Sequence, residues 1–232
     1  MASTAAVFGS TGAVGSKILD TLLASDFFST VQTISRRAPK ATESAKLNAI
    51  VETDTSKWAP AIAALSPLPS TVFNAVGTTR AAAGGIANQW KIDHDLCIEN
   101  AKAAKAAGVK TYVYISSAGT RSLVGSMLPY SKMKNGVEDA IRELDFDHAI
   151  IVRPAAILGE REVPKNALFE GLMGSLNKIS QALQDKLGSD QLYIGRSAVV
   201  AARLAEEGKA PSKYWIIENA DVLKMGRDEW KQ

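Results

Sequence analysis

Cysteine is almost absent from this sequence, and histidine is nearly as rare. The single cysteine, Cys97, allows no disulfide within the chain, which is typical of a reducing compartment or of a fold that needs no cross-link. Cys97 lies in an alanine-rich helical stretch without a histidine partner, so we interpret it as a core residue. Of the two histidines, His94 lies between Asp93 and Asp95, but consecutive helical residues point apart. We therefore expect a solvated helix face there and no metal site.

The sequence also lacks a run that reads as a transmembrane helix. Its longest uncharged stretch, residues 58–79, is long enough to span a bilayer but contains Pro60, Pro67 and Pro69. It predicts a helix, a loop and a strand instead, with no transmembrane segment. There is no lipidation motif or obvious amphipathic anchor, although peripheral membrane attachment remains compatible with the sequence. We expect no cleavable leader, because Gly9 already belongs to a functional loop.

No cluster of one charge sign is present. The net charge is +3, and the basic residues are scattered, so nothing indicates a nucleic-acid partner. Hydrophobic residues make up 46% and charged residues 22% of the 232 residues, as in a globular protein with a filled core. Without repeats or linkers, the composition predicts one domain over residues 1–232, with a cofactor-binding core over about 1–154 and closing elements over about 155–232.

What the sequence does contain is a regular alternation of strand-like and helical segments. This order predicts an α/β fold of the Rossmann type: a doubly wound, mainly parallel sheet with helices on both faces. The expected strands are Ala5–Phe8, Val31–Ser35, Asn48–Val51, Thr71–Val76, Thr111–Ile115 and His148–Val152. The expected helices are Val14–Ala24, Lys57–Leu65, Gln89–Ala107, which should stop at Gly108, and Ser131–Leu144. The last third is less regular, with helical patterns at Leu168–Leu187 and Ser197–Glu206 and a late strand at Tyr214–Ile217.

The first strand runs into a glycine-rich loop with the spacing G-x-x-G-x-x-G, formed by Gly9, Gly12 and Gly15. Glycine lets the backbone approach a pyrophosphate, and the following helix N-terminus offers free N–H groups to its negative charge. Taken alone, such a loop also fits a tight surface turn, but its position between the first strand and the first helix favours dinucleotide binding. The expected cofactor contacts are Gly9, Ser10, Thr11, Gly12, Ala13 and Val14.

Two arginines, Arg36 and Arg37, follow the second strand, and no carboxylate occurs until Glu43. NAD sites usually carry an acidic residue here, whereas NADP sites carry arginine, whose guanidinium binds the 2′-phosphate. The alternative is a pair of solvated surface arginines. The sequence therefore favours NADP(H) as the cofactor.

The sequence also contains a Y-x-x-x-K motif, Tyr130 to Lys134. Residues four apart share one helix face, so the Lys134 ammonium can approach the Tyr130 phenol and lower its pKa from about 10. Ser117 lies just after the fifth strand, at the sheet edge where catalytic groups gather. An exposed Tyr–Lys pair and a serine turn closing the strand are the alternatives. We expect Ser117, Tyr130 and Lys134 to be catalytic, with Tyr130 and Lys134 also contacting the cofactor.

Together these residues resemble the short-chain dehydrogenase/reductase superfamily. Four further segments narrow the resemblance: Thr78–Gly85, Lys91–Asp95, Ser116–Gly119 and Leu158–Arg161. They look like the atypical reductase-like proteins of the fungal mitochondrial outer membrane and, more distantly, the human Tat-interacting oxidoreductase-like regulators. The resemblance covers about Val7 to Arg161 and implies an intracellular location, cytoplasmic or on the cytosolic face of that membrane.

The resemblance also implies further cofactor contacts. Asp54 would lie beside the adenine, and Ala75, Val76 and Gly77 would pass under the nicotinamide ribose. The turn from Pro154 to Ile157 would hold the carboxamide. Many relatives have Arg-Pro-Gly at this turn, whereas Ala155 stands here in place of the glycine. The substitution is expected to alter the nicotinamide pocket without abolishing it.

Two functional hypotheses follow. In the first, the protein is an NADP-dependent oxidoreductase that reduces a carbonyl, or oxidises an alcohol, of a small-molecule substrate. In the second, it binds NADPH and regulates a partner with little turnover. Retention of the serine, tyrosine and lysine favours the enzyme. Neither the substrate nor the oligomeric state is encoded in a pattern that can be interpreted.

Overall fold

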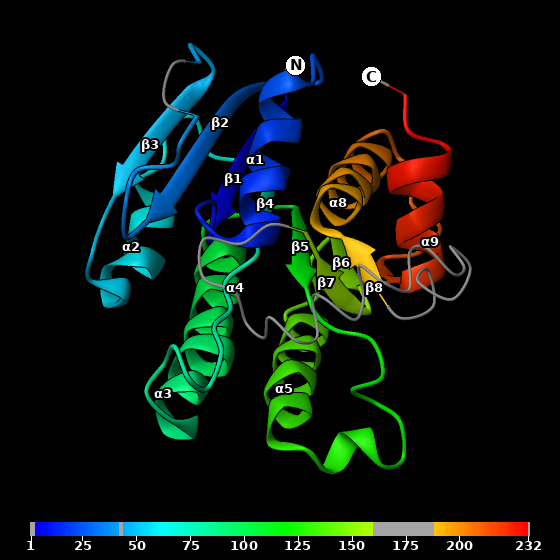
Figure 1. Cartoon of the computed structure of the whole chain (residues 1–232). Helices are drawn as coiled ribbons and strands as arrows, with labels where there is room; N and C mark the ends of the chain where they lie inside the picture. Colours follow the sequence, from blue (N-terminus) through cyan, green and yellow to red (C-terminus); the bar gives the residue numbers. More distant parts are fainter. Residues whose placement is uncertain (1–2, 42–43, 160–187, 232) are drawn as a thin grey trace.

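The computed structural model describes residues 3–41, 44–159 and 188–231 of the chain. Seven strands form one parallel sheet in the order β3-β2-β1-β4-β5-β6-β9 (Figure 1). Their bounds are β1 Ser3–Phe8, β2 Phe28–Ser35, β3 Leu47–Val51, β4 Thr71–Asn74, β5 Thr111–Ile115, β6 His148–Arg153 and β9 Tyr214–Glu218. Two short strands, β7 Ala156–Leu158 and β8 Gly188–Asp190, pair separately. The predicted Rossmann-type fold class is confirmed.

Helices cover both faces of the sheet (Figure 1). On one face lie α1 Ala13–Ala24, α8 Gln191–Glu206 and α9 Asn219–Leu223, and on the other lie α2 Trp58–Ala63, α4 Leu96–Ala106 and α5 Pro129–Glu143. The short helix α3 Ile86–Trp90 precedes α4. Helical turns of other types occur at Thr55–Lys57, Lys91–Asp95, Gly125–Met127 and Lys224–Asp228. No helix among the described residues is both long and apolar enough to cross a membrane.

Strand β1 shows why the sheet needs two helical layers. Ala5 and Val7 pack into the core on the side of α1 and α8, whereas Ala6 and Phe8 pack on the side of α2 and α4. Successive side chains of a strand point to opposite faces, so a strand that is apolar at every position must be covered on both sides. The apolar run Ala5–Phe8 therefore fits the position of β1 inside the sheet, between β2 and β4.

Several predicted bounds differ from those in the structure; for example, β2 begins at Phe28 instead of Val31, and α5 begins at Pro129 instead of Ser131. The expected helix Gln89–Ala107 is interrupted by a π-helical turn at Lys91–Asp95. Helix α8 begins at Gln191, six residues before the expected start, because the Asp190 carboxylate caps it by accepting a hydrogen bond from the Leu192 N–H. Strand β4 ends at Asn74, since the Asn74 side chain accepts from the Val76 N–H. The helix expected at Leu168–Leu187 lies outside the described residues.

The strand order reverses between β1 and β4, and this reversal locates the ligand crevice. Connections from β1 and β2 run toward one edge of the sheet, while those from β4 onward run toward the other edge. In such sheets, a crevice opens at the carboxyl ends of the strands where the order changes. The glycine loop after β1 and the segment after β4 therefore flank the position where a dinucleotide binds in this fold.

Candidate cofactor and active site

The glycine loop is built from close backbone contacts. Gly9 has a φ of +77°, and the N–H of Gly12 donates to the Gly9 carbonyl at 2.9 Å. A Cβ on Gly9 would lie 2.8 Å from the Ala75 carbonyl carbon, so only glycine fits where the β1 and β4 loops meet. A Cβ on Gly15 would collide with the Gly9 carbonyl oxygen. Two of the three glycines are therefore required by the loop itself.

The start of α1 has the features of a phosphate site. Gly12 is the N-cap, and among the described residues no side chain caps the first N–H groups of this 12-residue helix. The Ser10 hydroxyl is buried in the same loop and has no hydrogen-bond partner in the part of the chain that the structure describes. A pyrophosphate would satisfy the N–H groups and the helix dipole, and a buried hydroxyl without a partner fits an absent ligand. The residues present therefore fit a dinucleotide cofactor.

Arg36 and Arg37 are exposed directly after β2, as the 2′-phosphate prediction requires. The Ser35 hydroxyl donates to the Arg37 carbonyl at 2.7 Å, which fixes the backbone of this turn. Asp54 follows β3, next to β2 in the sheet, and its carboxylate accepts from the N–H and hydroxyl of Ser56. These two bonds lower the pKa of Asp54, so its carboxylate is held charged at this edge.

The segment after β4 is held by a buried carboxylate, that of Asp93, which was expected to be solvated. Asp93 is 1% exposed and accepts from the Thr78 N–H at 2.7 Å and from the Gln89 side chain at 3.1 Å. The expectation of a solvated helix face at residues 93–95 was wrong for Asp93, because the π-helical turn rotates it inward. Asp93 thus anchors the backbone beside Val76 and Gly77, two of the expected cofactor contacts.

The expected catalytic residues lie at the carboxyl edge of β5 and at the start of α5. Ser117 is half-buried two residues after β5, and Tyr130 is 40% exposed in the first turn of α5. Lys134 is buried and donates to the Tyr114 phenol at 3.1 Å and to the Ile115 carbonyl at 3.0 Å. Tyr130 and Lys134 interact electrostatically, but no hydrogen bond joins their side chains among the described residues.

The environment of Lys134 keeps it charged. Burial disfavours its ammonium, but electrostatic interactions with its neighbours, of which Tyr114 and Tyr130 are the largest and Cys97 and Asp93 follow, outweigh burial and raise the pKa of Lys134 above its ordinary value. Burial also raises the pKa of Tyr114 despite the nearby ammonium, so that phenol stays neutral. A buried positive charge is therefore held at the end of β5, within electrostatic range of Tyr130. The sequence did not predict the contact between Tyr114 and Lys134, because the apolar pattern of a buried strand does not show which tyrosine contacts a lysine on another element.

The turn from Pro154 to Ile157 meets the Ser117 loop. The Ala118 N–H donates to the Pro154 carbonyl at 2.8 Å, and this hydrogen bond holds the two segments together. The Ala155 N–H donates to the Asn219 side chain at 2.8 Å, and Ile157 pairs with β8. The turn thus accommodates Ala155, whose backbone N–H is paired.

The loop between Ser117 and Tyr130 exposes an unusual amount of apolar surface. Leu123 is 92% exposed and Val124 80% exposed, and Met127 and Leu128 are also largely exposed. The loop begins and ends at two of the expected catalytic residues, so this apolar surface borders the site. Isolated exposed apolar residues are ordinary, but four within six positions are not.

Cys97 contributes no chemistry to the site. It is fully buried, and burial raises its pKa to about 12, which leaves the unreactive thiol form at neutral pH. Within the described part of the chain, no group of three His, Cys, Asp or Glu side chains is placed to hold a metal ion.

Comparison with known proteins assigns the chain to a class. The sequence matches the NAD(P)H-binding family over residues 9–183, which spans the glycine loop, β4, β5 and α5. Solved structures share the fold: MoeE5 in complex with UDP-glucose and NAD has a TM-score of 0.67 at 14% identity, covering 97% of this chain and 81% of that one. The UDP-glucuronic acid 4-epimerase from Bacillus cereus, in complex with UDP-glucuronic acid and NAD, has a TM-score of 0.66 at 15% identity, with 93% and 76% covered. The chain is an NAD(P)H-binding protein of the Rossmann fold.

Closer relatives identify the particular family. Protein fmp52-2, mitochondrial, of Aspergillus oryzae is 69% identical over 230 residues, covering 99% of this chain and 100% of that protein. Protein FMP52, mitochondrial, of Chaetomium globosum is 57% identical over 228 residues, covering 97% of each. The chain belongs to the FMP52 family, as the resemblance to the fungal reductase-like proteins predicted.

Proposed function

We propose that this protein is an NADPH-dependent oxidoreductase that reduces the carbonyl group of an apolar small molecule. The observation that carries the proposal is the buried ammonium of Lys134, which is hydrogen-bonded to the end of β5 and interacts electrostatically with Tyr130 at the start of α5. That edge also carries the glycine loop, so a cofactor bound there would reach toward β5. The exposed apolar loop bordering the site favours an apolar substrate over a charged one.

In the proposed reaction, Tyr130 acts as the general acid. When bound, NADPH supplies the hydride that forms the new C–H bond at the carbonyl carbon, and NADP⁺ remains. The Tyr130 hydroxyl gives its proton to the carbonyl oxygen as the C=O double bond becomes a C–O single bond. Ser117 donates a hydrogen bond to that oxygen, and Lys134 stabilises the phenolate that Tyr130 becomes. The reverse sequence oxidises an alcohol with the same groups.

The cofactor contacts proposed for this chain follow the same edge. The residues at the start of α1 would bind the pyrophosphate, Arg36 and Arg37 the 2′-phosphate, and Asp54 the adenine side. Ala75, Val76 and Gly77 would line the nicotinamide ribose, and Pro154 and Ile157 the carboxamide. The proposed preference for NADPH over NADH rests on the two arginines alone. The solved structures named above contain NAD and therefore give no support for NADPH.

One observation favours the rival function, an NADPH-binding regulator with little turnover. Both hydrogen bonds of the Lys134 ammonium go to β5, and neither goes to Tyr130. In a reductase, cofactor binding must therefore bring the phenol and the ammonium together. In a regulator, no such change is needed, and NADPH occupancy alone would control a partner protein.

A single-turnover experiment separates the two functions. NADPH oxidation is followed at a saturating concentration of aliphatic aldehydes, aromatic ketones and quinones, in the parent and in Tyr130→Phe. For a reductase, Tyr130→Phe should slow the rate by about 10²–10⁴-fold, the usual contribution of a general acid, without weakening NADPH binding. Equal rates in the two proteins would show that Tyr130 is not the acid. Absence of turnover with every class, together with tight NADPH binding, would favour the regulator.

The location is inferred from the relatives alone. Both relatives described above carry the word mitochondrial in their names. We infer that this protein also resides at mitochondria, bound peripherally to the cytosolic face of the outer membrane. Carbonate extraction and protease treatment of isolated mitochondria test this directly: the protein should be released by carbonate and digested without membrane rupture.

A further inference from the structure

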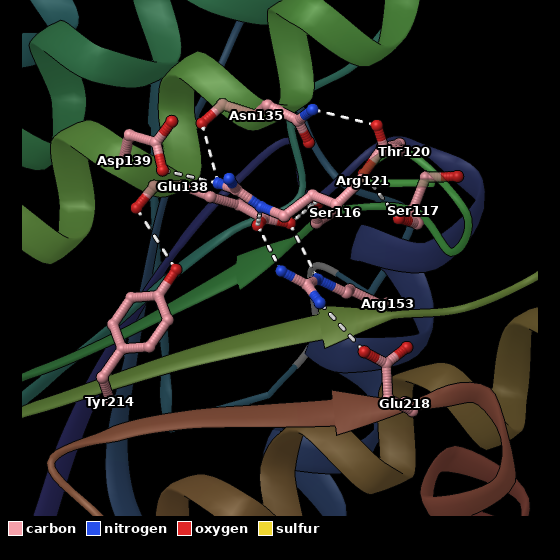
Figure 2. Close-up of polar contacts among 10 residues, drawn as sticks. All are labelled: Ser116, Ser117, Thr120, Arg121, Asn135, Glu138, Asp139, Arg153, Tyr214 and Glu218. Atoms are coloured by element: carbon pink, nitrogen blue, oxygen red, sulfur yellow. Dashed lines mark hydrogen bonds and ion pairs between the residues drawn. The ribbon is translucent and has the colours of Figure 1, made fainter. Parts of the chain in front are cut away.

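Glu138 is the most completely buried carboxylate beside the proposed site. Its side chain is 0% exposed in the middle of α5. It accepts hydrogen bonds from the Ser116 hydroxyl at 2.5 Å, from Arg121 Nε at 3.0 Å and from two nitrogens of Arg153, at 3.1 and 2.6 Å (Figure 2). A buried charge is costly unless it is paired and hydrogen-bonded, and here both carboxylate oxygens have partners.

The partners of Glu138 come from the two segments that flank the proposed reaction centre. Ser116 is joined directly to Ser117, and Arg153 is joined directly to Pro154. Arg153 also pairs with Glu218 at the end of β9, at 2.9 Å (Figure 2). One side chain on α5 therefore contacts the ends of both β5 and β6, next to the residues expected to hold the substrate oxygen and the carboxamide.

Glu138 itself is placed by the helix that carries the other expected catalytic residues. It follows Lys134 by four residues, so the two side chains lie on the same side of α5. A hydrogen bond from Ser116 to Glu138 consequently fixes the distance between the Ser117 loop and the Tyr130–Lys134 helix. Arg153 fixes the Pro154 turn against the same helix.

We propose that Glu138 is the positioning residue of this site: through Ser116 and Arg153 it holds Ser117 and the Pro154 turn in register with Tyr130 and Lys134. The inference rests on the proposed reductase function, because its effect is read in turnover. Glu138 touches neither cofactor nor substrate in this role. Its contribution is geometric, and small displacements of reacting groups are sufficient to change rates by large factors.

The chemistry of the cluster requires a carboxylate rather than an amide. Both oxygens of Glu138 accept from charged guanidinium groups. In Glu138→Gln, one oxygen becomes an NH₂ donor facing an arginine N–H donor, so at least one of these contacts is lost and becomes repulsive. Glu138→Asp keeps the charge and both acceptors but has a shorter reach, and should restore part of the rate.

The decisive test is a double-mutant cycle between Ser116 and Ser117, because Ser116→Ala removes only one hydrogen bond and should fold. Single-turnover NADPH oxidation with the best substrate should slow about tenfold in Ser116→Ala, while the dissociation constant for NADPH changes less than twofold. When Ser117 is already replaced by alanine, the further change Ser116→Ala should lower the rate of NADPH oxidation less than twofold, because Ser116 acts through the Ser117 hydroxyl, which is then absent. Glu138→Gln should slow turnover more than Ser116→Ala.

The matched control is Glu143→Gln, the same carboxylate-to-amide change at an exposed position of α5. It should change neither the rate nor the cofactor affinity. The positioning role would be overturned if Ser116→Ala slowed NADPH oxidation equally in the parent and in Ser117→Ala, or if neither Ser116→Ala nor Glu138→Gln changed the rate. Those outcomes would not contradict the proposed reductase function, provided that Tyr130→Phe still oxidises NADPH more slowly than the parent. An unchanged rate in Tyr130→Phe, or no turnover in the parent, would overturn both proposals.

Discussion

The ammonium of Lys134 lies 3.1 Å from the phenol oxygen of Tyr114, a fully buried residue of β5. A second hydrogen bond, to the Ile115 carbonyl, completes a clamp between the strand and α5. Lysine has three donors, so one remains for a ribose hydroxyl or for Tyr130. The clamp fixes the position of the positive charge before any ligand binds.

Removal of the Tyr114 hydroxyl should therefore change how the site titrates. In Tyr114→Phe, the buried ammonium loses an acceptor and its largest favourable electrostatic interaction, so the pKa of Lys134 falls from its raised value. Activity depends on the charged form and is lost as pH rises through that pKa. The alkaline limb of the single-turnover pH profile should move to lower pH.

Tyr112→Phe is the control for this experiment. Tyr112 is the other fully buried tyrosine of β5, and its phenol accepts from Asn74 at 2.9 Å instead of from Lys134. It should lose a similar stability, about 1 kcal/mol for one buried hydrogen bond, with no shift of the pH profile. Coincident profiles for the parent and Tyr114→Phe would mean that the clamp does not control the charge.

Two glycine substitutions should separate loop folding from cofactor binding. In Gly15→Ala, the new Cβ collides with the Gly9 carbonyl oxygen, which should cost about 1–3 kcal/mol of stability. In Gly12→Ala, the new Cβ lies 3.2 Å from the Gly9 carbonyl oxygen, a tight contact that a shift of a few tenths of an ångström relieves, so the fold should lose much less stability than in Gly15→Ala. The methyl group nevertheless stands where α1 would meet a pyrophosphate. Calorimetry should show NADPH affinity at least about tenfold weaker in Gly12→Ala, with nearly the parent's melting temperature. Parent-like affinity would place the phosphates elsewhere.

The two arginines after β2 should decide the choice of dinucleotide. Hydrogen bonds between charged groups contribute about 1.5–3 kcal/mol each, so NADPH should bind the parent more tightly than NADH. Arg36→Ala combined with Arg37→Ala should weaken NADPH binding and leave NADH binding nearly unchanged. Dissociation constants for the two cofactors, measured by fluorescence titration in both proteins, test this. Equal constants in the parent would contradict the NADP assignment.

The buried Glu138 should make stability depend on pH. Desolvation raises the pKa of this carboxyl, but hydrogen bonds from Arg153, Ser116 and Arg121 outweigh it and hold the pKa below the ordinary value of 4.5. A lowered pKa means that the stabilisation is fully present above about pH 4.5 and is lost as pH falls toward the folded-state pKa.

Urea unfolding of the parent and of Glu138→Gln at several pH values measures this contribution. Near neutral pH, the variant should be less stable by up to about 3–5 kcal/mol, the cost of breaking a buried ion pair. The difference should shrink as the pH is lowered below 4.5, because the parent's carboxyl then also becomes neutral. A difference that stays constant over this range would show that the charge of Glu138 does not stabilise the fold.

Much of this protein follows from the sequence because the signals are local. The alternation of apolar strands and amphipathic helices specifies a parallel sheet, the spacing of Gly9, Gly12 and Gly15 specifies a strand–loop–helix connection, and four residues of helix place Tyr130 and Lys134 on one face. The glycine spacing and the Tyr130–Lys134 pair depend on backbone geometry over fewer than ten residues, and each strand or helix in the alternation has its own short-range pattern. The subdivision of the chain into domains stays a prediction.

Other features were decided only by the tertiary structure. Asp93 precedes the polar residues His94 and Asp95 in the sequence, yet it lies in a π-helical turn with its side chain buried, where it accepts a hydrogen bond from the Thr78 N–H. Tyr114 and Glu138 look like any strand tyrosine and helix glutamate until β5, β6 and α5 pack together and bring Lys134, Ser116 and Arg153 to them. Contacts between residues 15 to 22 positions apart depend on how whole elements pack, and no local periodicity encodes that.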